Sequence, residues 1–215
     1  MRHVNAMAAL ASALSIGLLG GAAHAANLIG DGDFSTPNTG GGYGFFANGQ
    51  VGPWMNTNGD ALEVGASGIY GLSCDGPGAC QNLEVNANTF DTVSQTVTLT
   101  AGKLYNLTWD YGGRPGGGPQ ILDVSFGGDP VKTDTGSFGV WSHNYVQVIG
   151  TGNPEDLVFA SEVTGGLPSY GNEITNVALS AAPEPATWAM MLMGLLGLGA
   201  MMRTERRRQV ATIAI

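Results

Sequence analysis

The chain has 215 residues, of which 43% are hydrophobic and only 12% are charged, and its formal net charge is −9 at pH 7. Within residues 26–182, three basic residues stand against fifteen acidic ones, so this region carries a formal net charge of −12. Binding to nucleic acid needs basic side chains that neutralise phosphates, and the composition therefore argues against DNA, RNA or anionic lipid as a partner. The acidic excess suits a solvated extracellular domain, or one that attracts divalent cations.

The N-terminus has the three parts of a secretory signal peptide. Arg2 and His3 precede an apolar stretch over residues 6–19, and Ala23 and Ala25 form an A-x-A cleavage site. Cleavage after Ala25 is expected to remove residues 1–25. An uncleaved membrane anchor is the alternative, but the apolar stretch is shorter than the roughly 20 residues that span a bilayer.

Cys74 and Cys80 are the two cysteines, and the turn-forming sequence Asp-Gly-Pro-Gly lies between them. In an exported protein such a pair predicts a disulfide. On the chain-entropy model a loop this short adds roughly 2 kcal/mol, enough to hold a loop but not the whole fold. A metal site is the alternative, but two thiols without a nearby histidine do not favour it.

Short runs in which apolar and polar residues alternate fill the middle of the chain. The expected strands cover residues 93–99, 104–109, 121–126, 145–149, 157–161 and 174–179. In the second run, Tyr105, Leu107 and Trp109 fall on one face. The glycine-rich residues 26–60 are expected to form long ordered loops between short strands. With no sustained helical periodicity, residues 26–182 predict one all-β domain, a two-sheet sandwich.

The segment from Gly112 to Gly118 is rich in glycine but does not predict a phosphate-binding loop. It lacks the Lys-Ser/Thr ending of a P-loop, and no helix is expected after it. A flexible connection between strands is the expected structure.

The sequence offers little support for an active site, and no enzyme activity is expected. His143 is the one histidine after the signal peptide, and neither Ser137 nor Ser142 lies in a nucleophile elbow. A glycosidase would need two carboxylates about 5 to 9 Å apart, a distance that sequence does not decide. The acidic residues on or beside expected strands are Asp110, Asp123, Glu155, Asp156, Glu162 and Glu173.

Aromatic residues near glycine or proline are the better candidates for ligand contact, because exposed rings stack on the apolar faces of sugars. The candidates are Trp54, Tyr111, Trp141 and Tyr170. Burial in the core is the alternative for each of them. Tyr111 with Arg114, in and beside the glycine-rich segment, is expected to be the pair least suited to a core. The predicted ligand-binding residues are Tyr111, Arg114, Trp141 and Trp54.

Loose motifs over residues 27–180 resemble the galactose-binding-like jelly-roll domains of bacterial exported proteins, including the domain-of-unknown-function group shared with plant cell-wall proteins. These motifs are Asn27-Leu28-Ile29, Gly32-Asp33-Phe34, Pro53-Trp54, Leu62-Glu63-Val64, Val93-Ser94-Gln95-Thr96-Val97, Gly102, Tyr105-Asn106-Leu107-Thr108 and Ile174-Thr175-Asn176-Val177. The resemblance implies a jelly-roll β-sandwich and carbohydrate binding. Its structural calcium site uses acidic residues at positions that are Ser35 and Thr175 here, with Asp31 and Asp33 as substitutes nearby. No metal or cofactor is therefore expected.

The C-terminal residues 183–208 resemble a PEP-CTERM sorting signal, which an exosortase recognises in Gram-negative bacteria. They contain Pro183, Glu184 and Pro185, then Trp188, an apolar run, and the basic cluster Arg203, Arg206, Arg207 and Arg208. Residues 188–202 are expected to form a short transmembrane helix that anchors the protein until the tail is cut near the prolines. A permanent anchor is the alternative. Residues 209–215 form an extension that such tails usually lack.

Together these features predict an exported, exosortase-processed protein of the cell surface or extracellular matrix that binds or is embedded in exopolysaccharide, as in a biofilm. A structural biofilm component without a defined ligand is the first alternative. A carbohydrate-active enzyme is the second.

Overall fold

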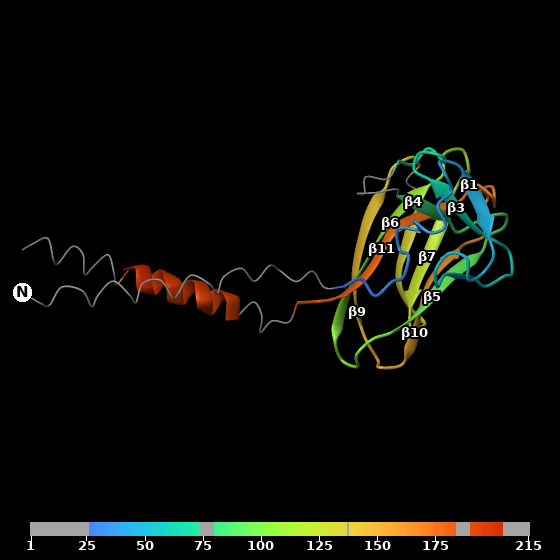
Figure 1. The fold of residues 1–215 in the computed structure, drawn as a ribbon. Coiled ribbons are helices and arrows are strands. Elements are labelled where there is room, and N and C mark those ends of the chain that lie inside the picture. The colour runs from blue at the N-terminus through green and yellow to red at the C-terminus, as the bar shows by residue number, and fades with distance from the viewer. Residues whose placement is uncertain (1–25, 74–79, 137, 184–189, 204–215) are drawn as a thin grey trace, which may run out of the picture.

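The computed structural model describes residues 26–73, 80–136, 138–183 and 190–203. Within them, strands form two antiparallel sheets that pack face to face (Figure 1). The strands are β1 (Tyr43–Phe46), β2 (Met55–Asn56), β3 (Leu62–Ala66), β4 (Gln81–Glu84), β5 (Thr92–Thr98), β6 (Leu104–Gly113), β7 (Ile121–Phe126), β8 (Asp129–Thr135), β9 (Ser142–Ile149), β10 (Pro154–Ser161) and β11 (Asn172–Ala181).

The order of the strands identifies the topology as a jelly roll. One sheet has the order β1-β3-β4-β11-β6-β9, and the other has the order β2-β5-β10-β7-β8. Among the eight strands from β4 to β11, β4 lies beside β11, β5 beside β10, β6 beside β9 and β7 beside β8. This nested pairing is that of an eight-stranded jelly roll, so the predicted all-β jelly-roll sandwich is confirmed.

The core lies between the two sheets and follows the alternation in the sequence. Each of the six expected runs is a strand, and Tyr105, Leu107 and Trp109 are buried on the inner face of β6. Aromatic rings fill the centre, where Phe159 lies 6.0 Å from Trp109 and 6.1 Å from Trp54 between ring centroids. The period of two therefore identified the inward side of these strands.

Several strands lack the alternation that would have predicted them. Residues 26–60, expected to form long loops between short strands, contain the short strands β1 and β2. All four residues of β4 are buried, because loops cover its outer side, so its sequence Gln-Asn-Leu-Glu shows no pattern of two. β8 is a polar, mostly exposed edge strand. When a strand is buried on both faces, or exposed on both, apolar and polar residues do not alternate along its sequence.

The termini and the cysteines fall partly outside the described residues. The signal peptide, Cys74, Trp188 and the arginines 206–208 are not described. Cys80 is buried, and the described part of the chain holds no free cysteine; the Cys74–Cys80 bridge stays a prediction.

In the tail, residues 190–203 are helical. Among the described residues, however, no helix is both long and apolar enough to cross a membrane, so the predicted span over 188–202 is not confirmed.

Candidate functional site

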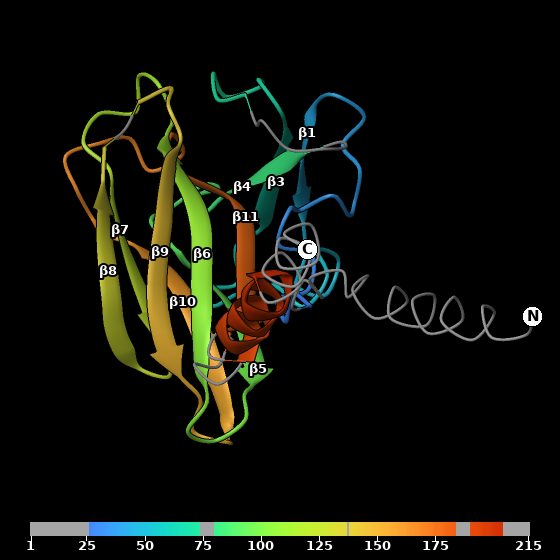
Figure 2. The same cartoon turned by 90° about the vertical axis from the view of Figure 1, so that its left-hand side faces the viewer.

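A pocket of about 360 Å³ opens on the outer face of the six-stranded sheet, beside β6, β9 and β11, which lie side by side in Figure 2. Its described lining is Gly71, Ser73, Asp110, Gly139, Val140, Trp141, His143 and Asn176. The volume lies within the range of pockets that bind small ligands. The lining combines one large aromatic ring with several polar groups.

The polar groups are brought together by neighbouring strands. Asp110 of β6 is the direct register partner of His143 of β9, and His143 Nδ1 lies 2.5 Å from Asp110 Oδ1. The side chain of His143 is 82% exposed, whereas that of Asp110 is 12% exposed. The carboxylate therefore holds the imidazole in place while leaving it open to the pocket.

Asn176 reaches the same carboxylate because β11 is irregular there. The register of β11 against β6 shifts between Thr175 and Ala178, and Asn176 has a positive φ of 50°. Asparagine adopts this left-handed conformation more readily than most residues. Asn176 Nδ2 donates to Asp110 Oδ2 at 2.8 Å, so both oxygens of this carboxylate have partners. Asp110, His143 and Asn176 were not predicted as one site, since they are far apart in the sequence.

Trp141 forms the aromatic wall of the pocket, and its contact with a ligand stays a prediction. Its side chain is partly exposed, and its indole Nε1 donates to the carbonyl oxygen of Ser73 at 3.1 Å. A Cβ atom at Gly112 would lie 3.2 Å from the Trp141 ring and 2.8 Å from Leu72. The missing side chain of Gly112 thus makes room for the indole against β6.

Two other predicted ligand-binding residues belong to the core, which corrects the expectation. β6 continues to Gly113, so Tyr111 keeps the same alternation as Trp109 and points inward. It is 1% exposed, and its hydroxyl donates to Asn172 Oδ1 at 2.9 Å. Trp54 is fully buried, and its Nε1 donates to the carbonyl oxygen of Asp31 at 3.1 Å. Neither ring is available to a ligand at the surface.

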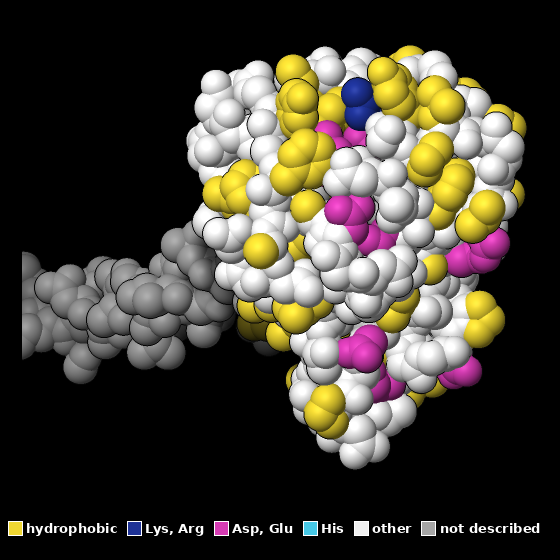
Figure 3. All heavy atoms as spheres, turned by 90° about the vertical axis from the view of Figure 1, so that its right-hand side faces the viewer, with side chains coloured by type: hydrophobic (Ala, Val, Ile, Leu, Met, Phe, Trp, Pro, Cys, Tyr) yellow, Lys and Arg dark blue, Asp and Glu magenta, His cyan; other side chains and the backbone are white. Residues whose placement is uncertain are grey.

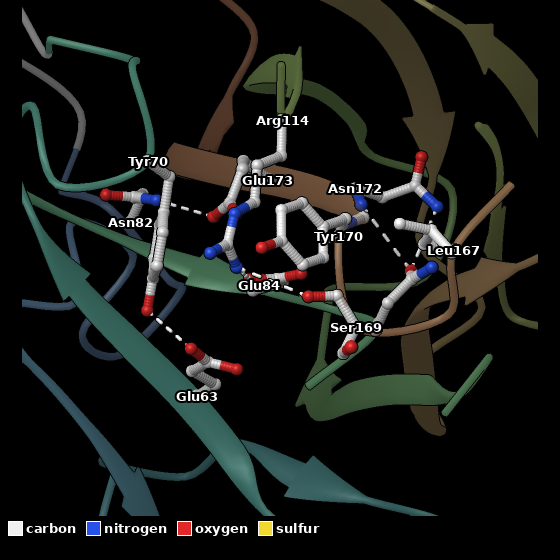
Figure 4. Close-up of polar contacts among 12 residues, drawn as sticks. Glu63, Tyr70, Asn82, Glu84, Arg114, Leu167, Ser169, Tyr170, Asn172 and Glu173 are labelled. Atoms are coloured by element: carbon white, nitrogen blue, oxygen red, sulfur yellow. Dashed lines mark hydrogen bonds and ion pairs between the residues drawn. The ribbon is translucent and has the colours of Figure 1, made fainter. Parts of the chain in front are cut away.

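Arg114 is engaged elsewhere, above a row of three buried glutamates (Figure 4). Its guanidinium lies between two tyrosine rings, 4.3 Å from the centroid of Tyr70 and 4.2 Å from that of Tyr170. Its Nη1 forms an ion pair with Glu84 Oε2 at 2.8 Å. The predicted pairing of Arg114 with Tyr111 as a ligand-binding unit is therefore wrong. Arg114 thus helps to shield the glutamates from solvent.

The three glutamates, Glu63, Glu84 and Glu173, are cross-strand neighbours on β3, β4 and β11. Each is at most 3% exposed. Tyr70 donates its hydroxyl hydrogen to Glu63 Oε1 at 2.6 Å, and Asn82 Nδ2 donates to Glu173 Oε2 at 2.5 Å. We call this set the buried glutamate row; sequence reasoning named Glu173 among the acidic candidates and Glu63 only as part of a family motif.

Burial and mutual repulsion raise the pKa values of these carboxyls. Burial, and then the charge of Glu63, raises the pKa of Glu84 to about 7, against the opposing effect of Arg114. Burial, followed by the charge of Glu84, raises the pKa of Glu173 well above its usual value. Burial also raises the pKa of Glu63. The single charge of the Arg114 guanidinium does not offset the charges of three buried carboxylates, so the protonated form of these carboxyls is favoured.

The positions that the jelly-roll resemblance implies for calcium do not fit that ion. Thr175 is fully buried, and its hydroxyl donates to the carbonyl oxygen of Gln81 at 2.7 Å. Ser35 supplies no carboxylate. Nearby, Asp31 Oδ1 accepts from the backbone N–H of Thr36 at 3.2 Å, and Asp33 Oδ1 accepts from that of Ser35 at 3.2 Å. These aspartates hold a turn.

Solved structures similar to this chain include carbohydrate-binding modules. The CBM22-1 xylan-binding domain of Paenibacillus barcinonensis Xyn10C is 10% identical, with a TM-score of 0.47, and the match covers 74% of this chain and 97% of that domain. The C-terminal family 22 module of Clostridium thermocellum Xyn10B is 15% identical, with a TM-score of 0.46 and coverage of 68% and 98%. A family 35 module from Clostridium thermocellum is 11% identical, with a TM-score of 0.41 and coverage of 65% and 98%.

No curated protein matches the chain. The family of the PEP-CTERM protein-sorting motif matches residues 181–208. This range contains the Pro-Glu-Pro sequence, the apolar run with the helix at residues 190–203, and the arginine cluster that ends at Arg208. The chain therefore carries a C-terminal PEP-CTERM sorting motif behind a jelly-roll β-sandwich.

Proposed function

We propose that this chain is an exported protein whose β-sandwich binds carbohydrate, without cleaving it, at the pocket beside Trp141. The sorting motif supports export, with an exosortase as the partner that processes the tail. The finer assignment, which we also propose, is a cell-surface or matrix protein that holds exopolysaccharide of the kind found in biofilms.

The observation that carries the binding proposal is the composition of the pocket. A partly exposed indole offers a flat surface for the C–H face of a sugar ring, and its hydrogen bond to Ser73 fixes its orientation. Beside it, the exposed imidazole of His143 offers a hydrogen-bonding group for sugar hydroxyls. Because Asp110 holds this imidazole in place, little freedom is lost on binding.

The arrangement of the carboxylates favours binding over hydrolysis. Glycoside hydrolysis generally uses two carboxyl groups on either side of the scissile bond. Of the described residues that line the pocket, Asp110 is the one carboxylate, and Asn176 and His143 occupy its oxygens. The buried glutamate row lies beneath Tyr70 and Arg114, where a polysaccharide has no access.

A glycan array with the purified protein tests the proposal, followed by calorimetric titration of any glycan that binds. We expect Trp141→Ala to weaken that binding at least tenfold while the circular dichroism spectrum stays unchanged. Tyr43→Ala is the matched control, because Tyr43 is an exposed ring on β1, at the opposite edge of the same sheet.

An array without any bound glycan would favour the alternative of a structural matrix protein without a defined ligand. Unchanged affinity in Trp141→Ala would rule out the pocket. Release of new reducing ends from a polysaccharide would favour an enzyme.

A further inference from the structure

A line of exposed side chains continues from the pocket along the outer face of β9. His143, Tyr145 and Gln147 alternate with buried or half-buried residues, so the three side chains share one face of this edge strand. Their register partners on β6 are Asp110, Thr108 and Asn106, none of which has a large side chain. The surface beside Trp141 is therefore an open strip two strands wide.

Tyr145 is a second aromatic ring on this strip, and it is held in place. It is 58% exposed, yet its hydroxyl donates to Asn106 Oδ1 at 2.9 Å. Gln147 Nε2 donates to the same oxygen at 3.1 Å, which fixes the amide that orients the tyrosine. An exposed ring with a restrained orientation loses little freedom when a ligand stacks on it.

The spacing of the two rings sets the size of the ligand. Trp141 and Tyr145 are four residues apart, which corresponds to about 13 Å along an extended strand. A single sugar ring cannot touch both platforms. A ligand that uses both must be a chain of several sugar units, lying along β9 with His143 between the two rings.

The charges around the strip decide which chains it accepts. Asp110 is acidic, and no Lys or Arg belongs to the described lining of the pocket. Arg114 is paired with Glu84, and Lys132 contacts Asn144 and Asp134. On the opposite side of the molecule, Figure 3 shows acidic side chains at several places and little basic surface. A uronate or sulfate chain over the pocket would meet the carboxylate of Asp110 without a lysine or arginine in the described lining; Lys103 precedes β6, beyond Asn106.

We infer, on the basis of the proposed carbohydrate-binding function, that the site takes an uncharged glycan chain that spans Trp141 and Tyr145 along β9. The ligand class is thus a neutral polysaccharide bound along its length, not a free monosaccharide or an acidic polysaccharide. Tyr145 supplies the contact that makes affinity depend on chain length.

Calorimetric titration of the full protein with defined sugars tests this inference. The probes are neutral hexasaccharides of glucose, mannose, xylose and galactose, their disaccharides, and hexagalacturonate. We expect one or more neutral hexasaccharides to bind roughly tenfold more tightly than the matching disaccharide, and Tyr145→Ala to remove this advantage. Tyr43→Ala, which removes a ring that is also 58% exposed, should leave it intact.

The outcomes separate this inference from the proposed function. If glycans bind and Trp141→Ala weakens them, but affinity does not depend on chain length or on Tyr145, the extended strip is wrong and the pocket stands. Hexagalacturonate binding as tightly as the neutral hexasaccharides would overturn the neutral class. If no probe binds and neither variant has an effect, both proposals fail.

Discussion

Glu173→Gln tests whether the buried glutamate row holds a proton. Glu173 is fully buried; Asn82 donates to its Oε2, and its Oε1 has no donor in the structure. A protonated carboxyl at Oε1 would instead donate a hydrogen bond, and the row offers as acceptor Glu84, the register partner of Glu173 on β4. Glutamine has the same shape, and its amide N–H₂ can donate in place of that O–H. The variant therefore keeps the hydrogen bonds of this side chain and removes the titration of Glu173.

The size of the change in stability with pH can be worked out from the pKa of Glu84. Folding raises the pKa of Glu84 from 4.5 to about 7. A carboxyl whose pKa is raised takes up a proton on folding, so its contribution to stability is complete below its unfolded pKa and is lost as pH rises through its folded pKa. A difference of one in pKa corresponds to about 1.4 kcal/mol, so the titration of Glu84 alone should cost the protein roughly 3 kcal/mol between pH 4.5 and pH 7, and Glu173 adds a further loss in the same direction. For a domain of this size, that is a fall in Tm of roughly 6 to 12 °C.

Thermal unfolding between pH 5 and pH 8, followed by circular dichroism, measures this effect. We expect the natural protein to lose stability as pH rises and Glu173→Gln to lose less, because the variant removes the titration of Glu173 and leaves that of Glu84, so that the variant is the more stable of the two at pH 8. Asp129→Asn, which removes an exposed carboxylate of β8, controls for the change in net charge. A natural protein equally stable at pH 5 and pH 8 would show that the row does not hold a proton, and a variant with the same dependence on pH would show that Glu173 is not the carboxyl that titrates.

Two further predictions concern the core and the tail. Tyr111→Ala should lower the free energy of unfolding by roughly 3 to 5 kcal/mol in denaturant titrations, because it empties a fully buried site and leaves Asn172 Oδ1 without the donor that Tyr111 supplies; a loss of glycan affinity at unchanged stability would contradict its place in the core. Mass spectrometry of surface material should find a C-terminus near Ala182 to Pro185 in cells that contain the exosortase, and recovery of the peptide with Trp188 from all of that material would show a permanent anchor instead.

The exposure of each aromatic residue was the main point that sequence could not decide. Tyr111 was expected at the surface because glycines follow it, yet β6 continues through Gly112 and keeps Tyr111 in phase with Trp109. Trp141 was selected by the same rule and does line the pocket. A glycine near an aromatic ring indicates only that the backbone has freedom there, and not which side of the sheet the ring faces.

The sequence by itself determined the all-β class, the inward faces of the strands with regular alternation, the acidic charge and the sorting motif, because each depends on neighbouring residues or on composition. Tertiary structure decided the site. Asp110, His143 and Asn176 meet only through the pairing of β6 with β9 and β11 and through the irregular register of β11. It also decided the buried glutamate row, because carboxylates that look solvent-exposed in sequence are covered by loops from elsewhere in the chain.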